Sequence, residues 1–211
     1  MNYVAYTDGS CVPNTGRGAW AAIIVDESSG SPEIVAQLSG AEDGTTSVRM
    51  EVQAAIGVLK YITAEHGIGC KIEIKSDATY LVNGGTKWLG EWRAKRLLDE
   101  NRSLHTQPKN ADLWRMIDAL VFGHHVIWTW IKGHSNNPYN SECDRLATEA
   151  RLGISGIQMN SPAWTKKVDP GQPLIEAAIK AVRDEAPWIT ITAATRIAKS
   201  VLHAVQQRGG K

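Results

Sequence analysis

Three strand patterns followed by a helix pattern open the chain, and this order restricts the fold more than any other feature. The segments 3–6, 19–25 and 33–40 read as strands separated by turn residues. Three strands joined by short turns predict an antiparallel meander. The next segment, 46–66, repeats apolar residues at helical spacing and meets a stop signal at Gly67.

The following part of the chain alternates strands with helices. Residues 71–75 alternate strictly between polar and apolar, which predicts a fourth strand. Because a helix precedes it, this strand is expected to lie parallel to a neighbour. Helical patterns follow at 78–82, 87–98 and 111–122, then a strand at 126–131 and a helix at 142–152. The expected fold is α/β, with a five-stranded mixed sheet flanked by helices over residues 1–152.

The C-terminal part differs in composition. Pro and Gly in 153–173 predict a linker or an irregular segment, and apolar residues at helical spacing predict a small helical extension over 174–211. Residues 155–211 carry eight Lys or Arg against four Asp or Glu, in a chain whose total net charge is only +1. The extension either packs on the main domain or on a second copy, or it contacts a nucleic-acid backbone; we favour packing.

Composition also bounds the location of the protein. No stretch reaches the roughly 20 apolar residues of a membrane span, and the first residues lack the order of a signal peptide. Three widely spaced cysteines, Cys11, Cys70 and Cys143, fit neither a zinc site nor a disulfide-rich scaffold. We expect a cytoplasmic protein that does not enter a membrane and is a monomer, with self-association through the tail as the alternative.

Four carboxylates occur where predicted strands and helices begin or end. Asp8 and Asp77 follow the first and fourth strands, Glu51 lies in the first turns of the long helix, and Asp144 lies in the last helix. Taken singly, each has a structural explanation as a turn residue, a helix-start acid or a solvated helix residue. If the strands that end at Asp8 and Asp77 are adjacent, both side chains emerge at one end of the sheet, where open sheets bind ligands.

Clustered carboxylates repel one another unless cations neutralise them. Oxygen ligands of this kind favour Mg²⁺ or Mn²⁺ over zinc. Two such ions about 4 Å apart suit phosphodiester cleavage, because one activates the attacking water and the other stabilises the leaving oxygen. The sequence therefore predicts a metal-dependent nuclease that needs no serine or cysteine nucleophile.

The motifs around these residues resemble those of ribonuclease H of the bacterial type 1 family, over about residues 1–152. The matching pieces, in chain order, are Tyr6-Thr7-Asp8-Gly9-Ser10-Cys11, Thr46 with Arg49-Met50-Glu51, Ser76-Asp77-Ala78-Thr79-Tyr80, Trp130-Ile131-Lys132-Gly133-His134-Ser135, and Asn140 with Cys143-Asp144-Arg145-Leu146-Ala147. The resemblance implies a ribonuclease H-like fold and cleavage of the RNA strand of RNA/DNA hybrids, leaving a 3′-hydroxyl and a 5′-phosphate. It implies that Asp8, Glu51, Asp77 and Asp144 bind two metal ions together with the substrate.

His134 resembles a loop histidine of this family that assists proton transfer or product departure. An imidazole, whose ordinary pKa is about 6.5, can move protons in either direction near neutral pH. The alternative is a solvated loop residue, and we favour the catalytic role.

Several positions resemble substrate-binding residues of the family. Asn14 and Thr46 would hold a phosphate of the DNA strand, although both also fit as turn and cap residues. A basic protrusion would grip the hybrid backbone through Trp88, Arg93, Lys95 and Arg96. The alternative is that the tryptophans are core and the charges solvated. We expect Trp88 to be partly functional and Trp92 structural.

The chain departs from the family where the minor groove is read. Ser47-Val48 replaces two amide residues that the family often has, and Thr79 replaces a frequent Gln. Valine cannot hydrogen-bond a 2′-hydroxyl, so weaker discrimination of the hybrid is expected.

Two further functions are open: a module that binds hybrids without cutting, which the complete acidic set disfavours, and a junction-cleaving nuclease on the same fold.

Overall fold

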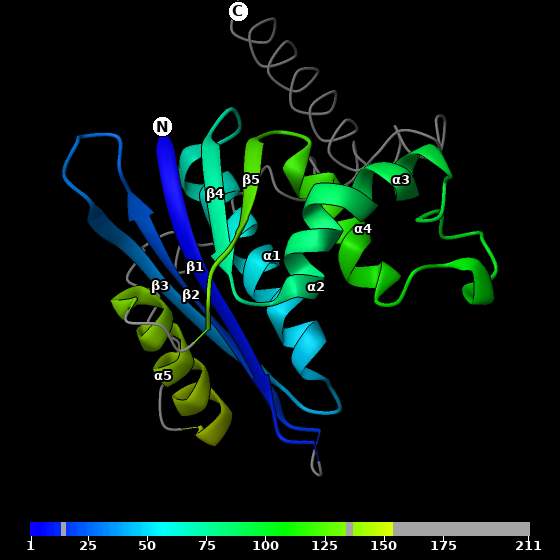
Figure 1. The fold of residues 1–211 in the computed structure, drawn as a ribbon, viewed down its shortest axis with the longest axis horizontal. Helices are drawn as coiled ribbons and strands as arrows, with labels where there is room; N and C mark the ends of the chain where they lie inside the picture. Colours follow the sequence, from blue (N-terminus) through cyan, green and yellow to red (C-terminus); the bar gives the residue numbers. More distant parts are fainter. Residues whose placement is uncertain (14–15, 134–136, 154–211) are drawn as a thin grey trace, which may run out of the picture. The chain divides into compact units, whose positions relative to one another are not determined.

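The computed structural model describes residues 1–13, 16–133 and 137–153, and their elements follow the predicted order (Figure 1). The strands are β1 (Asn2–Cys11), β2 (Gly18–Asp26), β3 (Glu33–Glu42), β4 (Lys71–Ser76) and β5 (His125–Trp130). They form one sheet in the order β3-β2-β1-β4-β5. The first three strands pair antiparallel, and β4 is parallel to both β1 and β5. The predicted meander and mixed sheet are confirmed, and β1 is adjacent to β4.

The helices are α1 (Ser47–His66), α2 (Thr79–Asn83), a π turn η1 (Gly84–Trp88), α3 (Leu89–Ala94), a short 3₁₀ helix η2 (Leu104–Thr106), α4 (Ala111–Val121) and α5 (Pro138–Leu152). Helix α1 begins and ends where the sequence predicts. The side chain of Thr46 accepts a hydrogen bond from the main-chain N–H of Arg49, and Gly67 follows the last turn with a φ of 72°.

Two helix boundaries differ from the prediction by four residues. Helix α5 begins at Pro138 rather than residue 142, because the side chain of Asn137 accepts hydrogen bonds from two main-chain N–H groups of the first turn and a proline occupies the first helical position. Helix α3 ends at Ala94 rather than residue 98. The chain turns there because Arg96 adopts a left-handed conformation, with a φ of 51°.

Helices cover both faces of the sheet, so that each face has its own core. In Figure 1, α1 and α4 lie on one side of the sheet and α5 on the other. Strand β1 contributes to both cores because alternate side chains point to opposite faces. Tyr3 and Ala5 join the cluster that includes α1 and α4, whereas Val4 and Tyr6 join the cluster under α5.

Helix α5 is attached to the centre of the sheet through Cys143. This side chain is fully buried, and its thiol donates a hydrogen bond to the main-chain oxygen of Tyr6 at 3.3 Å. Burial raises the pKa of the thiol above its ordinary value. Because Cys143 is fixed on β1, the next residue of α5, Asp144, lies near the end of that strand.

Among the described residues, no helix is long and apolar enough to cross a membrane. The predicted linker beyond Gly153 and the helical extension over 174–211 lie outside the described residues.

Candidate metal and active site

Asp8 and Asp77 lie at the same end of the sheet because β1 and β4 are parallel neighbours. The ladder pairs Tyr6 with Lys75, so each aspartate follows two residues later on its own chain segment. Asp77 comes directly after β4, as predicted. Asp8 lies within β1 rather than at its end, because β1 continues to Cys11 in its pairing with β2.

Glu51 reaches these aspartates because Gly9 has no side chain. A Cβ atom at Gly9 would lie 2.3 Å from the main-chain nitrogen of Glu51 and 2.5 Å from the carbonyl carbon of Met50. The first turns of α1 can therefore approach the backbone of β1. One carboxylate oxygen from each of Asp8, Glu51 and Asp77 lies within 4.8 Å of the others.

The cluster gathers three acidic side chains, and their proximity affects their protonation. Burial first, and then the charges of Asp8 and Asp77, raise the pKa of Glu51 to about 9, against a hydrogen bond from Gly9 that lowers it. The Oε2 atom of Glu51 is buried and has no hydrogen-bond partner among the described residues. Three oxygen ligands with an unpaired buried oxygen among them fit a hard divalent cation.

The three carboxylates line a hollow of about 270 Å³ that also includes residues of α5. Asp144 is an exposed residue of this lining and lies outside the tight group of three. The structure thus brings all four predicted carboxylates to one hollow, with oxygen atoms of three of them within 4.8 Å of one another.

Asn140 and Ser10 also line the hollow; both belong to the matching motifs, although no role was predicted for either from the sequence. Asn140 is 4% exposed, and its Oδ1 atom has no hydrogen-bond partner among the described residues; neither does the buried Oγ atom of Ser10. Buried polar atoms without partners beside a charged hollow fit metal-bound water. The helical spacing of Asn140 and Asp144 would have indicated a shared face if the helix start at Asn137 had been identified.

His134 and Asn14 lie outside the described residues. Their predicted roles in proton transfer and phosphate binding stay predictions.

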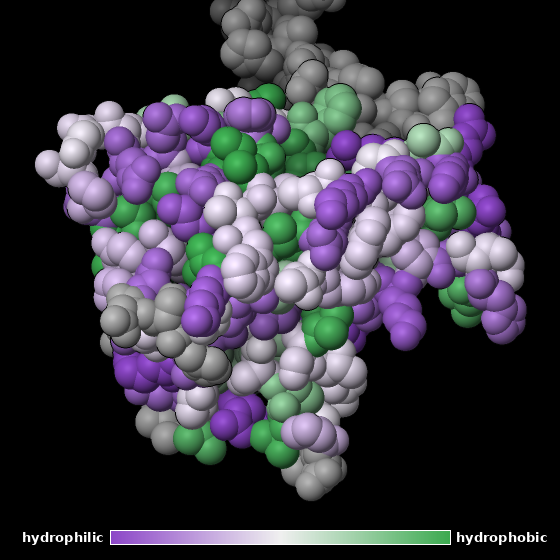
Figure 2. Space-filling view, viewed as in Figure 1, coloured by the Kyte–Doolittle hydropathy of each residue, from purple (hydrophilic) through white to green (hydrophobic). Residues whose placement is uncertain are grey.

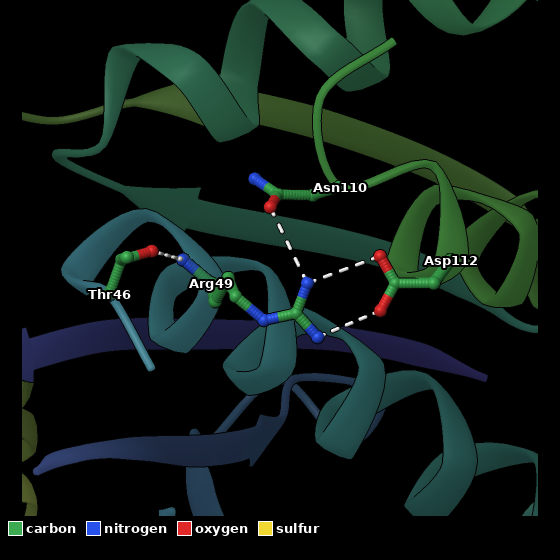
Figure 3. A network of polar contacts seen from close by, with 4 residues as sticks. All are labelled: Thr46, Arg49, Asn110 and Asp112. Atoms are coloured by element: carbon green, nitrogen blue, oxygen red, sulfur yellow. Dashed lines mark hydrogen bonds and ion pairs between the residues drawn. The ribbon is translucent and has the colours of Figure 1, made fainter. Parts of the chain in front are cut away.

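Figure 3 shows how the N-terminus of α1 is attached to α4. The guanidinium of Arg49 donates to both carboxylate oxygens of Asp112, at 3.1 and 2.7 Å, and to Oδ1 of Asn110 at 3.4 Å. This pairing lowers the pKa of Asp112.

Thr46 caps α1, since its hydroxyl oxygen accepts from the main-chain N–H of Arg49 at 3.3 Å, and it is exposed together with Ser47. Thr79, at the start of α2, is exposed as well.

Trp88 and Trp92 belong to a group of aromatic rings beside α4. The Trp92 ring lies 5.3 Å from that of the fully buried Trp114, and it packs against the main core. The Trp88 ring lies 5.5 Å from Tyr80 and 5.9 Å from Trp92, and it is partly buried. Both tryptophans are therefore partly buried, and of the two it is Trp92 that packs against the main core.

The predicted basic residues after Trp88 are exposed but differ in their pairing. Arg93 forms an ion pair with Asp118 of α4. Lys95 forms one with Glu91, in which Nζ lies 3.6 Å from Oε2. Arg96 has no charged partner among the described residues. In Figure 2, hydrophilic residues predominate over α3 and the segment that follows it, with a few apolar residues between them.

The comparisons with known proteins agree on one family. The family model described as RNase H matches residues 1–151. A ribonuclease H of Francisella philomiragia is 39% identical over 159 residues, which cover 74% of this chain and 94% of that protein. A ribonuclease H of Aeromonas salmonicida is 39% identical over 149 residues, covering 70% of this chain and 88% of that protein.

Solved structures give the same result for the fold. The crystal structure of LC9-RNase H1, described as a type 1 RNase H with the type 2 active-site motif, has a TM-score of 0.64 and 25% identity, covering 82% of this chain and 83% of that one. The crystal structure of RNase H1 from the archaeon Halobacterium salinarum has a TM-score of 0.52 and 23% identity, covering 74% of this chain and 100% of that one. The latter is a likeness of fold alone.

Proposed function

The chain belongs to the ribonuclease H family, and on that premise we propose that Asp8, Glu51, Asp77 and Asp144 hold the metal ions of its reaction. Members of this family are metal-dependent endonucleases that hydrolyse the RNA strand of RNA/DNA hybrids, and this is the reaction of the chain. The observation that supports the assignment is the approach of three carboxylate oxygens to within 4.8 Å of one another. Asp144 lines the same hollow from α5.

Mg²⁺ is the proposed ion, with Mn²⁺ as a substitute, and two ions are proposed to act together with the substrate. Carboxylates supply only oxygen ligands, which these ions prefer. When bound, the ions lower the pKa of the attacking water and stabilise the leaving oxygen. The unpaired Oε2 atom of Glu51 is suited to the cation, and the unpaired Oδ1 atom of Asn140 to a water molecule on it.

The protein side chains have distinct proposed roles. Asp8 and Asp77 bind the ions from the sheet, and Glu51 binds them from α1. Glu51 releases its proton when the cations bind. Asp144 is the most exposed of the four and contacts the site from the substrate side. His134 transfers a proton or assists product departure.

Substrate contacts are proposed on two sides of the hollow. At the N-terminus of α1, Thr46 and Ser47 offer hydroxyl groups, and the helix start itself favours an anion such as a phosphate of the DNA strand. Asn14 is proposed to contact the same phosphate, and Thr79 the minor groove. Further along the hybrid, backbone contacts are proposed for a partly basic set that consists of Trp88, Arg93, Lys95 and Arg96.

Cleavage of a labelled RNA/DNA hybrid tests this assignment. We expect cutting that requires Mg²⁺ and that falls at least about 100-fold in Asp8→Asn, since a metal ligand is lost. Asp43→Asn is the matched control, because Asp43 is exposed and forms a surface ion pair with Arg17, at 3.5 Å, instead of lining the hollow. Equal cutting by the wild type and Asp8→Asn would contradict the assignment.

The same substrates separate the alternative functions. A four-way junction cut faster than the hybrid would favour the junction nuclease. Binding of the hybrid without Mg²⁺-dependent cleavage would favour the binding module.

A further inference from the structure

The backbone of Asp77 is held by the end of β5. Trp130 is 52% exposed, yet its indole N–H donates to the main-chain oxygen of Asp77 at 3.1 Å. The main-chain N–H of Ile131 donates to the oxygen of Ser76 at 3.0 Å. The carbonyl groups of Ser76 and Asp77, at the end of β4, thus both accept hydrogen bonds from the end of β5. The bond from Ile131 continues the main-chain pairing of β4 with β5, whereas the bond from Trp130 depends on a side chain.

The carboxylate of Asp77 occupies space that exists because Gly133 has no side chain. A Cβ atom at Gly133 would lie 2.2 Å from Oδ2 of Asp77 and 3.3 Å from its Cβ atom. The main chain at Gly133 therefore lies directly beside the carboxyl group. Any side chain there would displace the oxygen that faces it, because 2.2 Å is far below a van der Waals contact.

We propose that Trp130 and Gly133 are positioning residues for Asp77, holding its carboxylate where it can share a divalent cation with Asp8 and Glu51. This inference rests on the proposed function, because it assumes that Asp77 is a metal ligand. Neither residue supplies a ligand. Trp130 fixes the main chain from which the carboxylate extends, and Gly133 leaves room for one orientation of it.

The electrostatics of the site explain why such support is needed. The carboxylates of Asp8 and Asp77 lie within 4.8 Å of each other and repel each other before a cation binds, so an unsupported Asp77 would turn away toward water. A preorganised ligand avoids that rearrangement when the cation enters. Residues that orient metal ligands from outside typically contribute about 10- to 100-fold to metal affinity.

Binding of Mn²⁺ alone to the full chain, measured by calorimetry without nucleic acid, tests the proposal. Trp130→Phe keeps an aromatic ring and removes the N–H donor; we expect the dissociation constant to rise about 10-fold. Gly133→Ala is expected to cause a larger rise. In both variants the increase in melting temperature on addition of Mn²⁺ should shrink, while the metal-free melting temperature of Trp130→Phe stays near that of the wild type.

Two control variants match these substitutions. Trp128→Phe lies two residues earlier on β5, where the ring packs against the main core. Gly90→Ala adds a methyl group in α3 where nothing lies within 4 Å. Both should bind Mn²⁺ with the wild-type dissociation constant, even if Trp128→Phe lowers the metal-free melting temperature.

Wild-type affinity for Mn²⁺ in Trp130→Phe would overturn the role of Trp130, and wild-type affinity in a folded Gly133→Ala would overturn that of Gly133. An equal loss of affinity in Trp128→Phe and Trp130→Phe would also overturn the proposal, because it would indicate a general effect of weakening β5. Failure of the proposed function gives a different result, since the wild type and Asp8→Asn would then bind Mn²⁺ equally.

Discussion

At the scale of single residues, Glu51 makes the metal-free protein sensitive to pH. The pKa of its carboxyl group is raised from 4.5 to about 9, first by burial and then by its two acidic neighbours. The folded protein therefore holds this proton more tightly than the unfolded chain does. Consequently the free energy of unfolding falls as pH rises from about 4.5 toward 9. We expect Glu51→Gln to stabilise the metal-free protein at pH 8 by roughly 1 to 3 kcal/mol.

Urea unfolding in EDTA at pH 5 and pH 8 measures this effect. The difference between wild type and Glu51→Gln should be small at pH 5 and large at pH 8. Glu91→Gln, at an exposed carboxylate beside Lys95, controls for the loss of one surface charge. A variant no more stable than the wild type at pH 8 would show that the cluster does not strain the fold.

Val48 gives a second prediction, about substrate choice. Its side chain is 39% exposed at the start of α1 and cannot hydrogen-bond a minor groove. We expect Val48→Asn to raise the preference for RNA/DNA hybrid over DNA duplex by about 2- to 10-fold, the value of one added hydrogen bond. Competition binding with the two duplexes measures the ratio.

Ile34→Asn is the control for this change, because Ile34 is an exposed apolar residue of β3. If Val48→Asn leaves the ratio unchanged, Val48 does not face the substrate.

At the scale of secondary-structure elements, the pair of Arg49 and Asp112 attaches α1 to α4. Their side chains are 26% and 54% exposed, so solvent screening reduces the value of the pair, whereas its bidentate geometry increases it. We expect Arg49→Met to lower the free energy of unfolding by about 1 kcal/mol. A double-mutant cycle with Asp112→Asn, followed by urea unfolding, measures the coupling.

Lys95→Met removes a more exposed pair on a single helix and should cost less. Strictly additive effects of Arg49→Met and Asp112→Asn would mean that the two side chains do not interact in solution.

The element boundaries show what periodicity predicts and what it misses. Helix α1 was predicted closely because apolar spacing, a capping threonine and a terminal glycine agree. The first turn of α5 was missed because it is polar, with only the capping Asn137 and the following proline to mark it. Because that turn was missed, Asn140 was not placed on the same helix as Asp144. The left-handed Arg96 that ends α3 has no sequence signal, since it is not a glycine.

At the scale of the whole molecule, two cores on opposite faces of the sheet predict how the chain tolerates truncation. We expect a chain that ends at Gly153 to fold and to cut the hybrid, because residues 1–153 contain both cores and all four carboxylates. A chain that ends at Gly133 lacks α5, exposes the second core and should not fold. Circular dichroism and hybrid cleavage of both chains test this. Failure of the longer chain to fold would show that the tail contributes to the core.

The whole fold was more predictable than the complete site. The meander and the mixed sheet were predicted from the order of strands and helices, whereas the adjacency of β1 and β4, which brings Asp8 and Asp77 together, entered only as a condition. The sequence could not indicate that Gly9 admits the backbone of α1, or that Gly133 lies against Asp77. Both depend on contacts between segments far apart in the chain, whereas periodicity reports on one segment at a time.

Because α5 is attached through the buried Cys143, the reactivity of the thiols indicates whether α5 has separated from the sheet. Cys11 is partly exposed, whereas Cys70 and Cys143 are buried, and burial keeps the Cys143 thiol protonated. An alkylating reagent should therefore modify Cys11 in the native state. It reaches Cys143 only in molecules whose α5 has separated from the sheet, so the rate of that second modification measures how often the hollow loses one of its walls.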